Sequence, residues 1–346
     1  MSAGPTLLLR ADATPGIGTG HVVRCLVLAR AWRERTAGRA VLATVAPVGP
    51  LASRVAAAGV EVRPIDGADA EATAEAARSE DATWVVLDGY GFDDAYQETV
   101  GRAGRPVLVL DDHGHAGAYR AELLLNQNFG ARPDPYAGSV PAERLLLGPR
   151  YALVAPEFAG VRAPDAPHRA RRVLVTLGGS DPDDTTASVV EALALAAIPD
   201  LEATVVAGPA NPHVDGLRTA VGAVGPAAEL VVDAADMPRR MARAELAVAA
   251  AGGTARELAL VGVPSLLLTL AENQRPAAEA MAALGVAVDL GWAHEASPAA
   301  VASALQDLAA DVGRRRAMVT RGRAEIDARG AGRVVAAMAR TGRLAG

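Results

Sequence analysis

Lysine is absent from this chain of 346 residues, cysteine occurs once, and aromatic side chains make up only 3% of it. The single cysteine, Cys25, excludes a disulfide within the chain and is typical of a reducing compartment. The strongly basic residues are all arginines, yet the net charge is −6. This balance argues against nucleic acid or an anionic membrane surface as the main partner.

Long hydrophobic runs are also missing. No segment reaches the about 20 apolar residues of a membrane span, and the start, MSAGPTLLLR, lacks the basic and apolar regions of a signal peptide. We therefore expect a cytoplasmic monomer without membrane insertion. Hydrophobic residues still make up 51% of the chain, which favours a globular protein, and its length favours two domains.

The first half alternates strand-like and helix-like patterns. Apolar runs occur at TLLLR, AVLATVA, VEVRPI, TWVVLD and PVLVLDD, and helix-like segments occur at 21–36, 49–58, 69–80 and 92–103. Such alternation predicts a parallel sheet with helices on both faces, and continuous runs such as WVVL suit strands buried on both faces. Two short runs, ELLLN and RLLLG, extend the predicted sheet.

The alternation restarts after a segment rich in proline, alanine and arginine, AGVRAPDAPHRAR. Strands are predicted at RRVLVT, LEATVVAG, ELVVD, ELAVAA and VPSLLLTL, and the pattern becomes wholly helical after Gly291. The predicted fold class is therefore α/β, with two Rossmann-like domains. We place the domains at 1–160 and 172–330, a linker at 161–171, and at 331–346 a C-terminal helix that packs back on the first domain.

The stretch RADATPGIGTGHVVR joins the first strand to the first helix and is the predicted catalytic loop. Its glycines, Gly16, Gly18 and Gly20, allow a close backbone approach to a ligand, and the free N–H groups of the following helix favour an anion. His21 opens that helix, whose positive end disfavours imidazolium, so we expect a neutral ring that accepts a proton. The charged residues around it are Arg10, Asp12 and Arg24.

A strand, a glycine-rich loop and a helix also allow a dinucleotide fingerprint. That fingerprint needs a tight turn directly after the strand, but here Gly16 comes well after Arg10. It also needs an acidic residue at the end of the second strand, and AVLATVAPV carries none. The fingerprint is therefore a poor match.

Polar residues recur where predicted strands end. Asp88 with Tyr90 follows one strand, the pair Asp111–Asp112 follows the next, and Asn126 with Asn128 follows ELLL. Because ligands bind at the carboxyl ends of parallel strands, these residues are predicted to share a crevice with the His21 loop, although ordinary turn chemistry is the alternative. His113 and His115 fit a solvated turn better than a metal site, so no metal is expected.

The second half carries three polar loops of its own after predicted strands. Backbone amides of glycine-rich loops can hold phosphate, and a carboxylate about one helical turn later can accept both ribose hydroxyls. The alternatives are a capping or surface role for the carboxylate of Glu257 and a helix N-cap role for Asn273. The predicted nucleotide-binding residues are Gly178, Gly179, Ser180, Gly252, Gly253, Thr254, Glu257, Asn273 and Gln274.

Taken in order, these motifs resemble one family. The stretches RADATPGIGTGHVVR, LDGYG, DDHGH, LLNQNFG, VLVTLGGSDPDD, AGGTARELAL and LAENQRPAAEAMAALG span residues 10 to about 335 together with NPHV and DARGAGRV. The chain thereby resembles the UDP-sugar hydrolases of the pseudaminic-acid pathway. These are UDP-2,4-diacetamido-2,4,6-trideoxy-β-L-altropyranose hydrolases, related to spore-coat polysaccharide proteins. Two Rossmann-like domains facing an inter-domain cleft also look like the GT-B fold.

The resemblance implies hydrolysis of a UDP-sugar at the anomeric carbon, without a metal or another cofactor. It assigns catalysis to His21 and substrate binding to Tyr90, Asn273 and Gln274. The sequence departs from the family pattern at Ala155, where an arginine is frequent, and at GGTARE, where Arg256 replaces a tryptophan. The alternatives are a GT-B glycosyltransferase that uses a UDP-sugar donor and a non-catalytic nucleotide-sugar binder.

Overall fold

The computed structural model describes residues 4–14, 18–45, 49–67 and 69–343. Gly16, the last residue of the predicted strand AVLATVA and the last three residues of the predicted C-terminal helix lie outside the described residues. The chain forms two compact units. Unit 1 consists of Met1–Pro156 and Ala328–Gly346, and unit 2 consists of Glu157–Asp327. Within the described residues, no helix has both the length and the apolar character that crossing a membrane requires.

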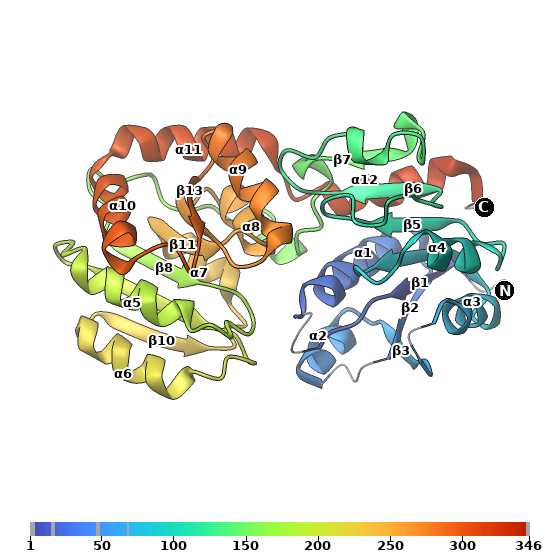
Figure 1. Ribbon diagram of the computed structural model, residues 1–346, viewed down its shortest axis with the longest axis horizontal. Coiled ribbons are helices and arrows are strands. Elements are labelled where there is room, and N and C mark those ends of the chain that lie inside the picture. Colours follow the sequence, from blue (N-terminus) through green and yellow to red (C-terminus); the bar gives the residue numbers. More distant parts are fainter. Residues whose placement is uncertain (1–3, 15–17, 46–48, 68, 344–346) are drawn as a thin grey trace. The chain divides into compact units, whose positions relative to one another are not determined.

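Unit 1 is built on a seven-stranded parallel sheet in the order β3-β2-β1-β4-β5-β6-β7 (Figure 1). The strands are β1 (Thr6–Arg10), β2 (Arg39–Thr44), β3 (Glu61–Pro64), β4 (Ala82–Asp88), β5 (Val107–Leu110), β6 (Leu123–Asn126) and β7 (Leu145–Leu147). The predicted runs ELLLN and RLLLG therefore do extend the sheet. The strand order reverses between β1 and β4, and such a switch point is where open α/β sheets bind ligands.

Helices cover both faces of this sheet. They are α1 (Gly20–Thr36), α2 (Ala52–Ala57), α3 (Ala70–Ser79), α4 (Asp94–Gly101) and α12 (Gly330–Met338). Leu7 and Leu9 of β1 are buried in the core that includes α1 and α12, whereas Leu8 belongs to the core that includes α3 and α4. This alternation explains why the three central positions of the strand, Leu7 to Leu9, are all apolar.

Unit 2 repeats the design with a six-stranded parallel sheet in the order β10-β9-β8-β11-β12-β13. The strands are β8 (Arg172–Thr176), β9 (Glu202–Ala207), β10 (Ala228–Val232), β11 (Leu246–Ala250), β12 (Ser265–Thr269) and β13 (Val288–Trp292). The order is that of a dinucleotide-binding Rossmann fold, with its switch point between β8 and β11. The edge strand β13 was not predicted, because it is only half-buried and interrupted by Gly291.

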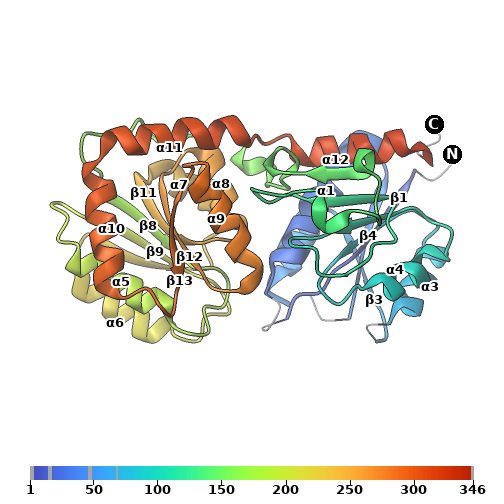
Figure 2. The same ribbon diagram turned by 45° about the horizontal axis from the view of Figure 1, so that its top comes forward.

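The helices of unit 2 likewise form a layer on each side of the sheet (Figure 2). They are α5 (Thr185–Leu195), α6 (Val214–Val224), α7 (Met237–Arg243), α8 (Gly253–Val261), α9 (Arg275–Ala283), α10 (Pro298–Ala310) and α11 (Val312–Glu325). Val189 of α5 and Leu305 of α10 pack on one face with Val175 of β8. The neighbouring Leu174 is also buried, so unit 2 is a second three-layer structure.

The segment that we expected to be a linker is bound to unit 2. Its Ala163 and Ala170 N–H groups donate to the Val261 and Ala309 carbonyls, each over 3.0 Å. The buried guanidinium of Arg315 donates to the Ala309 carbonyl and to the Pro167 carbonyl. Backbone groups of this segment therefore have fixed partners, which proline-rich composition alone does not reveal.

Candidate active site

The loop after β1 brings His21 to the start of α1. The Gly18 N–H donates to the Thr14 carbonyl over 2.8 Å, and the φ of +78° at Gly18 favours glycine. A Cβ added at Gly18 or Gly20 would meet nothing within 4 Å, so the backbone here borders open space. Thr19 makes no side-chain cap, and the first turn of α1 carries no acidic residue. The N-cap residue itself therefore does not cap the amide end of α1.

His21 forms a buried pair with Asp88, the last residue of β4. The His21 Nδ1 atom lies 2.6 Å from Asp88 Oδ1. Burial alone would raise the pKa of the Asp88 carboxyl, but the Arg24 guanidinium and the His21 hydrogen bond hold the pKa below its ordinary value. An ionised carboxylate only accepts hydrogen bonds, so Nδ1 of His21 carries the hydrogen. The Nε2 atom of a neutral ring is then the one that can take a proton.

Arg24 lies one turn along α1 and joins two strand ends. Its Nε and Nη2 atoms donate to the two Asp88 oxygens, each over 2.6 Å, and Nη1 donates to Asp112 Oδ1 over 2.9 Å. Despite burial, which opposes the charge, the two carboxylates raise the pKa of Arg24 well above its ordinary value. The bidentate contact fixes the orientation of Asp88, and through it the ring of His21.

Tyr90 stands beside this group with an exposed ring. Its hydroxyl donates to Asp112 Oδ2 over 2.9 Å, and its ring meets the His21 ring edge-on, with centroids 5.0 Å apart. Tyr90 remains 41% exposed, so its ring offers an apolar surface next to the imidazole. The structure therefore brings together four residues predicted to share the site: His21, Arg24, Asp88 and Tyr90.

Asn126 lies in the same network but makes its contacts to protein. Its Nδ2 atom donates to the Tyr136 hydroxyl over 2.8 Å, and its Oδ1 atom accepts from the Asn128 N–H over 3.0 Å. Asn128 in turn donates to Asp112 Oδ1 over 3.1 Å. Asn126 thus holds the loop after β6 against the site, and its predicted role in binding substrate stays a prediction.

The DDHGH turn differs from the solvated turn that we expected. His113 is exposed, but His115 is largely buried, with Nδ1 2.5 Å from Asp111 Oδ1. The Asp111 carboxylate also accepts from the Tyr136 hydroxyl over 2.8 Å and the Gly114 N–H over 2.6 Å. Burial opposes the charge, yet these three donors lower the pKa of Asp111 to about 2.

Asp111→Asn should therefore lower the free energy of unfolding by about 2 kcal/mol at neutral pH, given the shift in pKa from 3.8 to about 2. Because the folded-state pKa is the lower one, this stabilisation is complete above the unfolded-state pKa and is lost as the pH falls through the folded one. Urea unfolding measures the free energy of unfolding of the wild-type protein and of Asp111→Asn at each pH. The difference between the two free energies should narrow by about half between about pH 7 and about pH 3.

The exposed Asp134→Asn serves as the control for that series, since Asp134 lies at the surface and should give little change at any pH. A loss of stability in Asp111→Asn that stays constant down to the lowest pH would contradict an ionised Asp111.

Arg10 and Asp12 do not surround His21 as predicted. The fully buried Arg10 pairs with Asp12 over 2.7 Å, and its guanidinium lies 5.2 Å from the Phe92 ring centroid. Asp12 also accepts from the Thr44 hydroxyl over 2.9 Å. Arg10 is the last residue of β1, and its side chain points into the core that holds Phe92 rather than toward α1.

In unit 2, the loop after β8 contains Gly178, Gly179 and Ser180. Gly178 has a φ of +98°, and a Cβ added there would meet nothing within 4 Å. The start of α5, however, is already occupied, because the buried Asp181 carboxylate accepts from the Thr185 and Thr186 N–H groups over 3.0 and 2.9 Å. An anion at this loop would have to use the glycine amides rather than the helix end.

The loop after β11 places a glycine, which has no side chain, at the N-cap of its helix. Gly252 is the N-cap of α8, Gly253 is its first residue, and the first turn, which includes Thr254, carries no acidic residue. The half-buried Glu257 follows one turn later. A Cβ added at Gly253 would lie 3.7 Å from Arg256 Nη2, so a guanidinium stands beside this amide end.

The loop after β12 lies next to the α8 loop. Gln274 Oε1 accepts from the Leu270 N–H over 3.0 Å, which closes the loop, and Gln274 Nε2 is 3.8 Å from a Cβ added at Gly252. Asn273 sits in the same short helix, Glu272–Gln274. The predicted nucleotide residues of this unit thus come from loops at and beside the switch point between β8 and β11.

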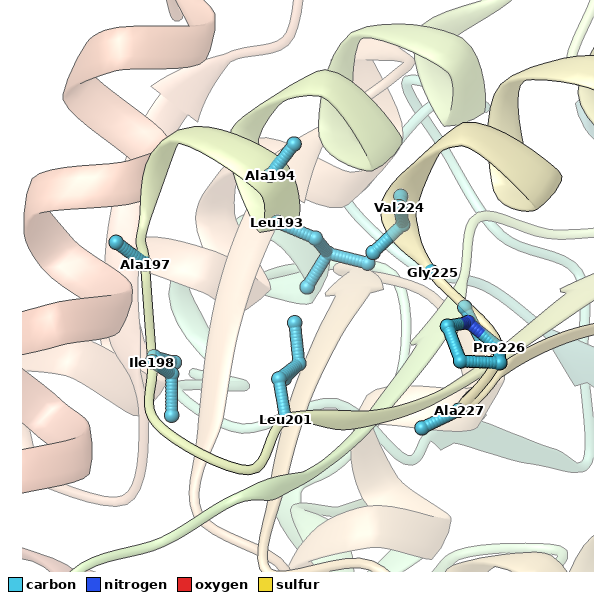
Figure 3. A pocket seen from close by; sticks show the side chains of 10 residues that line it. Leu193, Ala194, Ala197, Ile198, Leu201, Val224, Gly225, Pro226 and Ala227 are labelled. Atoms are coloured by element: carbon cyan, nitrogen blue, oxygen red, sulfur yellow. The ribbon is translucent and has the colours of Figure 1, made fainter.

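A separate hollow of about 240 Å³ lies near the amino ends of β9 and β10, away from these loops. Figure 3 shows Leu193, Leu201 and Val224 lining it, and none of the described residues that line the hollow is charged. Apolar walls alone offer no groups for acid–base chemistry. Nowhere in the described ranges do three or more histidine, cysteine or acidic side chains gather as metal ligands would.

Comparison with solved structures decides the fold. MurG of Acinetobacter baumannii aligns with a TM-score of 0.68 and 15% identity over 97% of this chain and 99% of that one. HepE of Anabaena in complex with UDP and glucose aligns at 0.64 and 14% over 97% and 100%. The calicheamicin glycosyltransferase CalG4 aligns at 0.64 and 20% over 99% and 100%. The chain has a GT-B-like fold.

Curated sequences support the resemblance to spore-coat polysaccharide proteins, whereas no family model matches the chain. The spore coat polysaccharide biosynthesis protein SpsG of Bacillus subtilis is 30% identical over 188 residues, 54% of each chain. An uncharacterised protein of Methanocaldococcus jannaschii is 22% identical over 272 residues, which is 76% of this chain and 55% of that protein. The chain thus spans about half the length of the curated relatives it matches.

Proposed function

We propose that this GT-B-like protein is a metal-independent hydrolase of a UDP-linked diacetamido-trideoxy sugar, acting in nonulosonic acid biosynthesis. The observation that carries the proposal is the Asp88–His21 pair clamped by Arg24 at the switch point of unit 1. This arrangement supplies a fixed imidazole with Nε2 available as a base. The nature of the sugar rests on the resemblance of the motifs to the hydrolase family.

In the proposed reaction, water attacks the anomeric carbon while His21 Nε2 takes its proton. A bond forms between the water oxygen and the anomeric carbon, and the bond from that carbon to the UDP oxygen breaks with its electrons. The negative charge that develops on the diphosphate is stabilised by backbone amides. The same base acting on an alcohol would give a glycosyltransferase, so the acceptor decides between the two activities.

The two glycine loops of unit 2 differ in what they offer a diphosphate. The start of α5 is capped by the Asp181 carboxylate, whereas the N-cap of α8 is Gly252 and its first turn carries no acidic residue. A carboxylate at a helix start repels phosphate, while helix amides without such a carboxylate and the nearby Arg256 guanidinium attract it. We therefore place the diphosphate at α8 and the ribose at Glu257.

Glu257→Ala should weaken UDP binding by about 1–3 kcal/mol, because the variant loses an acceptor for the ribose hydroxyls. Calorimetric titration with UDP measures the change directly. The matched control is Glu191→Ala, which removes an exposed glutamate on α5. An unchanged UDP affinity in Glu257→Ala would remove Glu257 from the site.

The decisive experiment incubates the protein with a panel of UDP-sugars and no acceptor and follows UDP release. Steady release identifies a hydrolase, whereas release only after an alcohol acceptor is added identifies a transferase. EDTA should leave the rate unchanged, since backbone amides meet the diphosphate in this proposal. Loss of activity that added Mg²⁺ restores would show that a metal takes part.

A further inference from the structure

Unit 1 contains a second carboxylate–imidazole pair on the strand next to Asp88. Asp111 follows β5 as Asp88 ends β4, and the two strands are neighbours in the sheet. The His115 Nδ1 atom lies 2.5 Å from Asp111 Oδ1, as the His21 Nδ1 atom lies 2.6 Å from Asp88 Oδ1. The proposed mechanism uses only the first of these pairs.

The partners of Asp111 determine the tautomer of His115. The carboxylate accepts from the Tyr136 hydroxyl and the Gly114 N–H as well as from His115. Burial and the Asp111 charge raise the pKa of Tyr136 above its ordinary value, so its hydroxyl remains a donor. With Asp111 ionised, the hydrogen of a neutral His115 ring sits on Nδ1, and Nε2 is a hydrogen-bond acceptor.

That acceptor has no hydrogen-bond partner in the part of the chain that the structure describes. The Nε2 atom of His115 is buried, and only 11% of the side chain is exposed. Burying an unsatisfied polar atom is unfavourable, so such an atom in a native protein calls for a partner such as a bound water or a ligand. His115 is otherwise well fixed, through Asp111 and an edge-on ring contact with Tyr119.

His115 lies near the proposed base, His21, because the ring of Tyr90 contacts both imidazoles. Its ring meets the Tyr90 ring edge-on, with centroids 5.5 Å apart, and the Tyr90 ring meets His21 at 5.0 Å. Tyr90 therefore contacts both imidazoles. The exposed His113 ring also packs on Tyr90 and on His115, with centroids 5.5 and 5.8 Å apart. A sugar lying on the Tyr90 ring would thus lie near both His21 and His115.

We infer that His115 binds the sugar of the substrate, with Nε2 accepting a hydrogen bond from a hydroxyl or acetamido N–H group. The inference rests on the proposed function for the identity of the ligand as a nucleotide sugar. The apolar C–H face of the sugar lies on Tyr90, and Asp111 acts as a positioning residue that keeps Nε2 free of hydrogen. His115 thereby selects sugars with a donor at that position.

The first test is His115→Phe, which keeps an aromatic ring against Tyr90 but removes both nitrogens. The KM for the UDP-sugar should rise about tenfold, as expected for one lost hydrogen bond, while the Kd for UDP stays unchanged. His294→Phe makes the same change at an exposed histidine of unit 2 and should alter neither constant. An unaltered KM in a folded His115→Phe variant overturns the inference.

The second test observes the imidazole nitrogens of His115 directly by NMR. It depends neither on turnover nor on the folding of a His115 variant. Protein labelled with ¹⁵N-histidine and carrying His21→Asn, which blocks the proposed base, is titrated with UDP-sugar and with UDP. The imidazole spectrum should show a hydrogen-free Nε2 in His115 that shifts on adding UDP-sugar but not UDP. No difference between the two ligands overturns the inference.

These outcomes separate this inference from the proposed function. If the wild-type protein releases no UDP from any UDP-sugar, the hydrolase proposal fails, and the spectra alone decide the role of His115. If the wild-type protein is a hydrolase but His115 responds to neither test, only the inference about His115 fails.

Discussion

His21→Asn should lower kcat by roughly 10²–10⁴-fold, the usual contribution of a general base. The affinity for UDP should stay close to that of the wild-type protein, because the proposed nucleotide site lies on unit 2. Asparagine retains a polar side chain at the start of α1 but cannot take the proton from water. Steady-state kinetics at saturating UDP-sugar, together with UDP calorimetry, measures both quantities.

The control for His21→Asn is His294→Asn, since His294 is exposed on unit 2. It should behave as the wild-type protein does. If His21→Asn folds normally and keeps most of its kcat while KM rises, His21 binds the substrate and another group supplies the base.

Asp88→Asn should produce a loss of kcat on the order of 10²–10⁴-fold, without removing any atom of the imidazole. An amide NH₂ facing His21 Nδ1 favours the tautomer with its hydrogen on Nε2, which leaves the base without its lone pair. In serine proteases the corresponding change costs about 10⁴-fold in kcat for the same reason. A ¹⁵N spectrum of His21 should accompany the kinetics. It should show the hydrogen on Nδ1 in the wild-type protein and on Nε2 in Asp88→Asn.

Thermal unfolding must accompany this measurement, because Asp88 also receives two hydrogen bonds from Arg24. Asp134→Asn, at an exposed position of the same unit, is the matched control. A stable Asp88→Asn variant with kcat within about twofold of the wild-type value would show that the tautomer of His21 does not limit the reaction.

The strands of both sheets were largely predictable, because a strand buried on two faces is apolar at every position. Leu7, Leu8 and Leu9 illustrate this, since all three are fully buried although they face different helices. The half-buried edge strand Val288–Trp292 left no such signal. Partial burial alone does not hide a strand, since the edge strands β3 and β10 are more exposed and were still predicted. Gly291 inside Val288–Trp292 is what distinguishes the strand that was missed.

The candidate site was predictable as a set of residues but not as a set of pairs. The residues at the ends of β1 and β4 had to meet, since parallel strands end at one edge of the sheet. The sequence did not show which side chains would form hydrogen bonds with Asp88. Arg10 is nearer to His21 than Asp88 is in the sequence, but its side chain points into the opposite core and pairs with Asp12.

The sequence predicts that Asp181 with Pro182 sets up the start of α5, but it does not show at which residue the helix begins. Asp181 precedes the first helical residue, Thr185, by four positions, and it reaches the helix amides because the backbone takes a positive φ at both Asp181 and Asp184. Such turn geometry depends on the surrounding loops, and a helix-start pattern does not encode it.

The discontinuity of unit 1 has a consequence for how the protein is made. Val334 and Met338 of α12 are fully buried in the core that also contains Leu28 of α1, but they are synthesised after all of unit 2. On the ribosome, unit 2 has its complete sequence before unit 1 does. Until α12 emerges, the nascent first half exposes the apolar surface of α1 that α12 covers in the folded unit.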